Sequence, residues 1–72
     1  METTDLQLIQ QLIPSNPELD RLMRQHRALE QRLHSLGKHP YLTQTEVVEQ
    51  RTLKKKKLAG RDRIEQILAR YR

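Results

Sequence analysis

The sequence predicts an all-α protein: an antiparallel helical hairpin, coiled-coil-like, preceded by a segment that forms a short helix or frays. Three observations predict this fold. Apolar residues recur at alternating spacings of three and four residues in two long stretches, as they do along a helix–helix seam. Residues that favour a helix start precede both stretches. The composition is typical of long solvated helices, because 32% of the residues are charged and 3% are aromatic.

The chain length limits the protein to one domain, since it has 72 residues. We divide it into an N-terminal segment, residues 1–16, and a hairpin domain, residues 17–72. A chain of this size buries little surface, so we expect further contacts from self-association or from a partner. Disorder is the competing interpretation, and a mean hydropathy of −0.90 favours it. The periodic leucines favour helices instead.

The N-terminal segment begins with Thr4 and Gln7, which fit a capping box at the start of a helix. Apolar side chains at helical spacing follow: Leu6, Ile9 and Ile13. Pro14 disfavours helical geometry at the residue before it, so the segment should stop there. A helix of about nine residues is not stable alone. The segment therefore either docks on the hairpin or frays.

The first long helix is predicted over residues 18–36. Asn16 is a suitable N-cap, and Pro17 suits the first helical position, where no amide donor is needed. Gly37 is expected to end the helix in a left-handed conformation. The seam positions follow a spacing of three and four residues: Leu19, Leu22, His26, Leu29, Leu33 and Leu36.

The second long helix is predicted over residues 44–71. Thr43 and Glu46 form a second capping box, and Leu42 and Val47 form a hydrophobic staple. The seam positions are Gln50, Leu53, Lys57, Gly60, Ile64, Ile67 and Tyr71. A connection of about six residues joins antiparallel neighbours in helical folds, which predicts the hairpin.

The antiparallel register places Leu36 near Val47 and Leu19 near Ile64. The second helix is the longer one, so apolar residues near its end extend beyond the first helix: Ile67, Leu68 and Tyr71. Either the N-terminal segment or a second copy of the chain could cover them. The residues of the segment suited to this are Ile9, Leu12 and Ile13.

Three seam positions are unusual. His26 is interpreted as a partly buried polar residue that sets the register and faces Lys57 or its neighbours. Metal binding is not expected, because His34 lies more than two helical turns away. Lys57 can pack its aliphatic stem while its ammonium group reaches solvent. Gly60 predicts a close approach of the two helices, with a tolerated weak point or a kink as alternatives.

The basic residues cluster in the second helix. Residues 1–36 sum to −1, whereas residues 37–72 sum to +6, which gives the net charge of +5. The candidate contacts for a polyanion are Lys54, Lys55, Lys56, Lys57, Arg61 and Arg63. The four lysines spread around the helix, which is unsuited to a flat phosphate-binding face. Charges beside a seam also select helix partners, so two uses compete.

Two stretches resemble the YdcH family of small bacterial helical proteins of unknown function. The first is similar to the family's His-x-x-Leu-x-x-x-Ile/Leu helix, and it reads Gln25-His26-Arg27-Ala28-Leu29-Glu30-Gln31-Arg32-Leu33. The second is similar to its Leu-Lys-Lys-x-Lys-Leu-x-x-Lys-Asp-x-Ile pattern, and it reads Leu53-Lys54-Lys55-Lys56-Lys57-Leu58, then Arg61-Asp62-Arg63-Ile64. Gly60 and Arg61 depart from the family pattern. The resemblance covers about residues 17–69 and implies a coiled-coil-like hairpin with no assigned activity.

No residues indicate catalysis. The sequence has no cysteine and two glycines, and it lacks a nucleophile–base pair, a metal-ligand cluster and a phosphate loop. We therefore expect no enzyme activity and no cofactor. We expect no membrane span and no secretory signal, hence a cytoplasmic protein. The predicted role is a protein-interaction module that pairs with itself as a dimer or with another helical protein. The alternative is low-specificity binding of nucleic acid or an anionic surface through residues 54–63.

Overall fold

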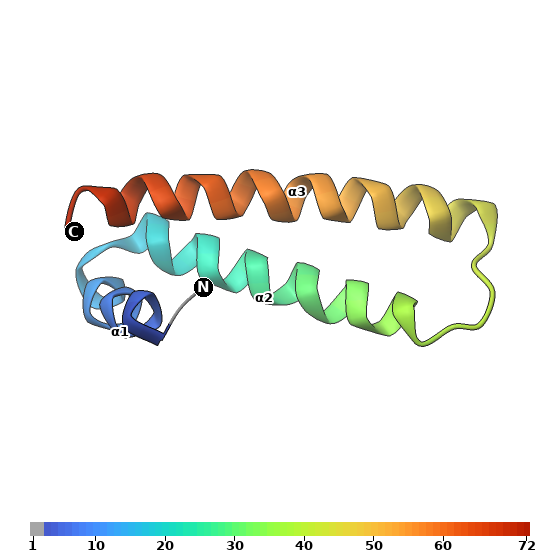
Figure 1. Cartoon of the computed structure of the whole chain (residues 1–72), viewed down its shortest axis with the longest axis horizontal. Helices are drawn as coiled ribbons and strands as arrows, with labels where there is room; N and C mark the ends of the chain where they lie inside the picture. Colours follow the sequence, from blue (N-terminus) through green and yellow to red (C-terminus); the bar gives the residue numbers. More distant parts are fainter. Residues whose placement is uncertain (1–2) are drawn as a thin grey trace.

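The computed structural model describes residues 3–72. Over this range the chain forms three α-helices, one short 3-10 helix and no strand, in the order α1 (Thr3–Leu12), η1 (Ile13–Ser15), α2 (Pro17–Gly37) and α3 (Gln44–Ala69). Figure 1 shows α2 and α3 side by side and antiparallel, with α1 at the end opposite their connecting turn. The result is a rod of 42 × 18 × 18 Å. The predicted helical hairpin with a short N-terminal helix is confirmed.

The N-terminal segment is helical. Because α1 begins at Thr3, Thr4 lies inside the helix. The predicted capping box of Thr4 and Gln7 is therefore wrong, since a capping residue precedes the first helical one. The α-helix ends at Leu12, two residues before Pro14, and the chain continues as η1.

The first residues of α2 and α3 are capped as predicted. The side chain of Asn16 accepts a hydrogen bond of 3.0 Å from the amide of Leu19, and Pro17 is the first residue of α2. The hydroxyl of Thr43 accepts from the amide of Glu46 at 3.2 Å, and the Glu46 carboxylate accepts from the amide of Thr43 at 3.0 Å. Local side-chain chemistry thus defines both helix starts.

The last residues of both helices differ from the prediction. Gly37 belongs to α2, and no glycine in residues 3–72 has a positive φ, so the left-handed end is wrong. The amide of Lys38 instead donates to the carbonyl of Ser35 at 3.2 Å, which closes the helix in a tight 3-10 turn. The α3 helix ends at Ala69 in the same way. Tyr71 follows the last helical residue, leaves the seam and is 54% exposed.

The core lies at the end where α1 meets the hairpin. We call this region the capped end, and its buried side chains are Ile9, Leu19, Ile64, Ile67 and Leu68. Leu19 and Ile64 are both fully buried, as the predicted register requires. Half-buried residues pack against this cluster: Leu8, Leu12, Ile13, Leu22 and Met23. The α1 helix therefore covers the overhanging residues of α3, with the exception of Tyr71.

The middle of the hairpin is more open. Leu29, Leu33 and Leu53 occupy their predicted seam positions but are only half-buried. No atom of α2 lies within 4 Å of the place that a Cβ atom would take at Gly60, so the predicted close approach of the helices there is wrong. The longer side chains at the neighbouring seam positions set the distance between the helices instead. Leu36, nearer the turn, is buried outside the main cluster.

Candidate interaction surface

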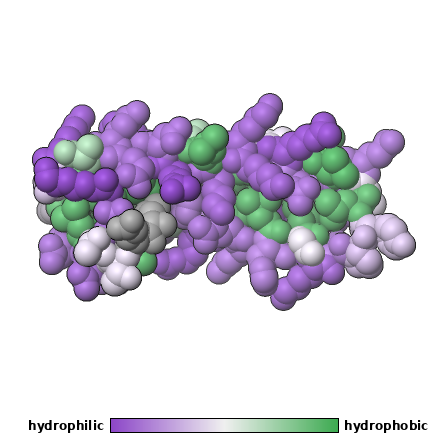
Figure 2. Space-filling model, viewed as in Figure 1, coloured by the Kyte–Doolittle hydropathy of each residue, from purple (hydrophilic) through white to green (hydrophobic). Residues whose placement is uncertain are grey.

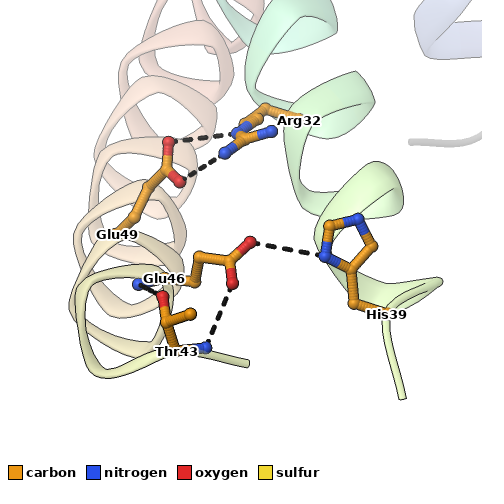
Figure 3. A network of polar contacts seen from close by, with 5 residues as sticks. All are labelled: Arg32, His39, Thr43, Glu46 and Glu49. Carbon is orange, nitrogen blue, oxygen red and sulfur yellow. Dashed lines mark hydrogen bonds and ion pairs between the residues drawn. The ribbon is translucent and has the colours of Figure 1, made fainter. Parts of the chain in front are cut away.

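An ion pair near the turn links the two long helices. Figure 3 shows the guanidinium of Arg32, on α2, facing the carboxylate of Glu49, on α3. Nε and Nη2 of Arg32 donate to the two carboxylate oxygens at 3.1 and 2.7 Å. The hydrogen bond from Arg32 lowers the pKa of Glu49, and the carboxylate raises the pKa of Arg32. This bidentate geometry matches the two charges to each other across the hairpin.

Glu46, near this ion pair, contacts both the start of α3 and the connecting turn. Besides capping α3, its Oε2 atom lies 3.3 Å from Nδ1 of His39, in the connecting turn (Figure 3). The hydrogen bond from the backbone of Thr43 is the main cause that lowers the pKa of Glu46. The carboxylate therefore ties the turn to the first residues of α3.

Arg63 forms the corresponding link toward the capped end. Its Nε atom donates to Oε1 of Glu18 at 2.6 Å, and its Nη1 atom donates to Gln66 at 3.3 Å. The hydrogen bond from Arg63 lowers the pKa of Glu18, and the same contact raises the pKa of Arg63. Of the candidate polyanion contacts, Arg63 is thus already matched by a carboxylate of α2.

Two of the polar seam residues, His26 and Lys57, meet through a carboxylate. Oε1 of Glu30 lies 2.6 Å from Nε2 of His26 and 3.8 Å from Nζ of Lys57. Nδ1 of His26 is buried and has no hydrogen-bond partner in residues 3–72. The prediction did not include Glu30, although its spacing of four residues from His26 on a helix was a usable signal.

Two grooves run along opposite sides of the middle of the hairpin, and each is lined by both long helices. The Leu58 groove contains Glu30, Leu33, His34, Lys54, Leu58 and Arg61, and Lys57 also lines it. The Gly60 groove contains Leu22, Ala28, Leu29, Lys56, Gly60 and Arg63. The basic residues are therefore divided between two sides of α3, and Lys55 lines neither groove. This arrangement agrees with the predicted spread of the lysines around the helix.

Charges are unevenly matched over the described chain. Within residues 3–72, every carboxylate except Asp62 lies within 4.0 Å of a basic side chain. Over the same residues many cations have no such carboxylate, including Lys54, Lys55, Lys56 and Arg61. The hairpin therefore uses its acidic groups internally and presents its basic groups to solvent.

Apolar side chains remain exposed beside these cations. Leu58 is 59% exposed and Val48 is 62% exposed, although both belong to α3. Figure 2 shows a mainly hydrophilic face, interrupted by an apolar area over the half of the hairpin nearer the turn and by smaller areas elsewhere. Of these two residues, only Leu58 lines a groove, where half-buried Leu33 lies across from it on α2.

Two further features concern ligands and membranes. No group of three or more histidine and acidic side chains in residues 3–72 is placed to hold a metal ion. Over the same range, no helix combines the length and the apolar character needed to cross a bilayer.

These features define a class: a small helical hairpin with a third helix over one end and unmatched cations along its middle. The chain belongs to the DUF465 family, a "Protein of unknown function" family whose model matches residues 19–68. YdcH-like proteins belong to this family, so the resemblance is confirmed. The match covers nearly all of α2 and α3 and begins after α1. No curated protein and no solved structure matches the chain.

Proposed function

We propose that this chain is a non-catalytic protein-interaction module whose hairpin accepts a further helix, from a second copy or from another protein. The observation that carries the proposal is the Leu58 groove. It combines a 59% exposed leucine with half-buried Leu33. A groove with an apolar floor and a polar border can accept the apolar face of an amphipathic helix.

The packing of the hairpin supports this proposal. Two helices in contact bury one stripe of each, and the flanks of the stripe stay exposed. At the capped end α1 covers such a flank, and Ile64 and Leu68 become fully buried there. In the middle of the hairpin, residues 3–72 supply no third helix. A partner helix would complete the same packing there.

Low-specificity binding of a polyanion is the second candidate. The unmatched cations of α3 favour it, because phosphate groups would neutralise them. Their distribution is less suitable, because Lys54 and Lys56 line opposite grooves. The sequence has only two aromatic residues, Tyr41 and Tyr71, so base stacking along the basic stretch has no support.

A capture experiment with the full chain tests the main proposal. The immobilised chain is exposed to native cell extract at about 50 and 200 mM salt, a range over which phosphate contacts weaken steeply. We expect proteins that wild type and Val48→Glu retain at both salt concentrations and that Leu58→Glu loses. Val48→Glu is the matched control, because Val48 is equally exposed on α3 but lies outside the Leu58 groove.

A duplex-binding assay tests the alternative. If a generic duplex binds with submicromolar affinity at the higher salt concentration, and Lys55→Glu and Lys56→Glu abolish that binding, polyanion binding replaces the interaction module. Far-UV circular dichroism of each variant checks that the helices persist.

A further inference from the structure

The Leu58 groove has a chemical character that restricts its partner. Its apolar floor comes from Leu33 on α2 and Leu58 on α3. Lys54 precedes Leu58 by four residues and Arg61 follows it by three, so both share the face of α3 that carries Leu58. In residues 3–72 no carboxylate lies within 4.0 Å of Lys54 or Arg61. Glu30 and Lys57 also line the groove, and they lie 3.8 Å from each other. The groove is thus an apolar strip whose unneutralised charges, Lys54 and Arg61, are basic.

We propose that the Leu58 groove binds an acidic amphipathic helix of another protein, an inference that rests on the proposed interaction function. Leucines spaced three and four residues apart on the partner would pack on Leu33 and Leu58. Aspartates or glutamates beside those leucines would face Lys54 and Arg61. The eight residues from Lys54 to Arg61 span about 10 Å of helix axis, which corresponds to about two turns of a partner helix.

A second copy of this chain is a poor occupant of the groove. Within residues 3–72, only Asp62 is a carboxylate without a basic neighbour, and it lies next to Arg61 in sequence. A second copy also brings a further net charge of +5. Docking it on the groove would place like charges together or break existing ion pairs, and both cost binding free energy.

The neighbouring lysines separate a helix partner from a nucleic acid. Lys54 and Lys55 are adjacent, exposed and without a carboxylate within 4.0 Å in the described chain. Of these two lysines, only Lys54 lines the Leu58 groove. A helix seated in the groove would meet Lys54 and not Lys55, whereas a phosphate backbone held by charge would use both. The apolar floor can also pack against the leucines of a helix, whereas a phosphate backbone has no apolar group to place there.

The test is a selection of displayed helical peptides against the full chain at about 0.15 M salt. The peptides have about 20 residues, long enough to cross the groove, with random residues on one face. We expect enrichment of peptides that carry leucines at helical spacing beside aspartate or glutamate. Leu58→Glu and Lys54→Glu should each weaken their binding at least about tenfold, and Val48→Glu and Lys55→Glu by less than about threefold.

The possible outcomes separate this inference from the proposed function. Enriched peptides that are neutral or basic, or that tolerate Leu58→Glu and Lys54→Glu, overturn the acidic-helix proposal alone. Sedimentation equilibrium that shows a dimer broken by Leu58→Glu assigns the groove to a second copy and keeps the interaction function. Duplex binding weakened equally by Lys54→Glu and Lys55→Glu, or no enriched peptide together with a concentration-independent monomer, rejects both.

Discussion

The capped end and the middle of the hairpin follow the same three-and-four repeat, yet they differ in burial. Leu19 and Ile64 at the capped end are 0% exposed. Leu29 and Leu33 occupy equivalent seam positions in the middle and are half-buried. The difference comes from α1, which adds Ile9 as a third layer at one end only. Along the middle of the hairpin the repeat therefore aligns two helices without burying the seam, and α1 completes the main core at the capped end.

The polar residues follow the same division. The buried cluster of the capped end contains only apolar side chains, whereas the middle contains His26, Glu30 and Lys57 in contact. Near the turn, ion pairs such as Arg32 with Glu49 hold the helices together. Apolar burial contributes more stability than exposed ion pairs do. We therefore expect the stability of the molecule to depend mainly on the capped end.

The largest expected effect is the difference between leucine-to-alanine substitutions at the capped end and in the middle of the hairpin. Leu19→Ala should lower the free energy of unfolding by about 3 kcal/mol, because it leaves a cavity among fully buried residues. Leu33→Ala should lower it by about 1 kcal/mol, because the groove is already open to water. Urea titration followed by far-UV circular dichroism measures both. Equal losses would contradict the comparison.

The second effect concerns α1 itself. Ile9→Ala should lower the free energy of unfolding by about 2 kcal/mol, since Ile9 is the buried side chain of that helix. Leu6→Ala is the control, because Leu6 belongs to the same helix and is 43% exposed. The same urea titration, with proteolysis near Pro14 as a second readout, tests this. Insensitivity to Ile9→Ala would show that α1 does not stabilise the hairpin.

The third effect is an increase in stability. Gly60→Ala should raise the free energy of unfolding by about 0.8–1 kcal/mol, because alanine favours the helix and its methyl group meets no atom within 4 Å. Gly37→Ala should give less, since Gly37 is the last residue of α2 and has the same open surroundings. Thermal melts of both variants compare their stabilities. A lower stability of Gly60→Ala than of wild type would indicate that the middle of the hairpin is more closely packed.

The smallest effect is a dependence on pH. Hydrogen bonds from Arg63, Thr43 and Arg32 hold the folded-state pKa values of three carboxylates below their ordinary value: Glu18, Glu46 and Glu49. The unfolded chain therefore binds protons first as the pH falls, and the stabilisation present above about pH 4.5 is lost below it. The urea concentration at the midpoint of unfolding should therefore decrease as the pH is lowered through this value. Glu49→Gln should reduce the slope of the urea midpoint against pH. An unchanged slope would exclude a role for the ion pair of Glu49 with Arg32.

Much of the fold could be predicted because its signals are local. The capping residues Asn16 and Thr43, and the proline at the start of α2, defined both helix starts. The helix ends were less certain, because Gly37 can remain helical when a 3-10 turn satisfies the last carbonyls. The overhang of the longer helix predicted that either α1 or a second copy would cover Ile67 and Leu68, and the structure places α1 there.

The candidate surface was less predictable, because it depends on which side chains meet across the hairpin. Sequence spacing placed Lys54 and Lys56 on different sides of α3, and the grooves agree. It could not indicate that Glu18 neutralises Arg63, a pair separated by 45 positions. The opening at Gly60 was also missed, since a small residue on a seam favours close approach only when its larger neighbours permit it.

The placement of α1 has a consequence for the order in which the chain is made. The α1 helix (Thr3–Leu12) leaves the ribosome long before residues 64–68, which it covers. A helix of 10 residues is not stable alone, and the docking surface of Ile9 is incomplete until the last turns of α3 emerge. A pause in translation before the last turns of α3 emerge would leave the N-terminal apolar segment exposed without its full docking surface. That nascent form is the one most open to proteases and to aggregation.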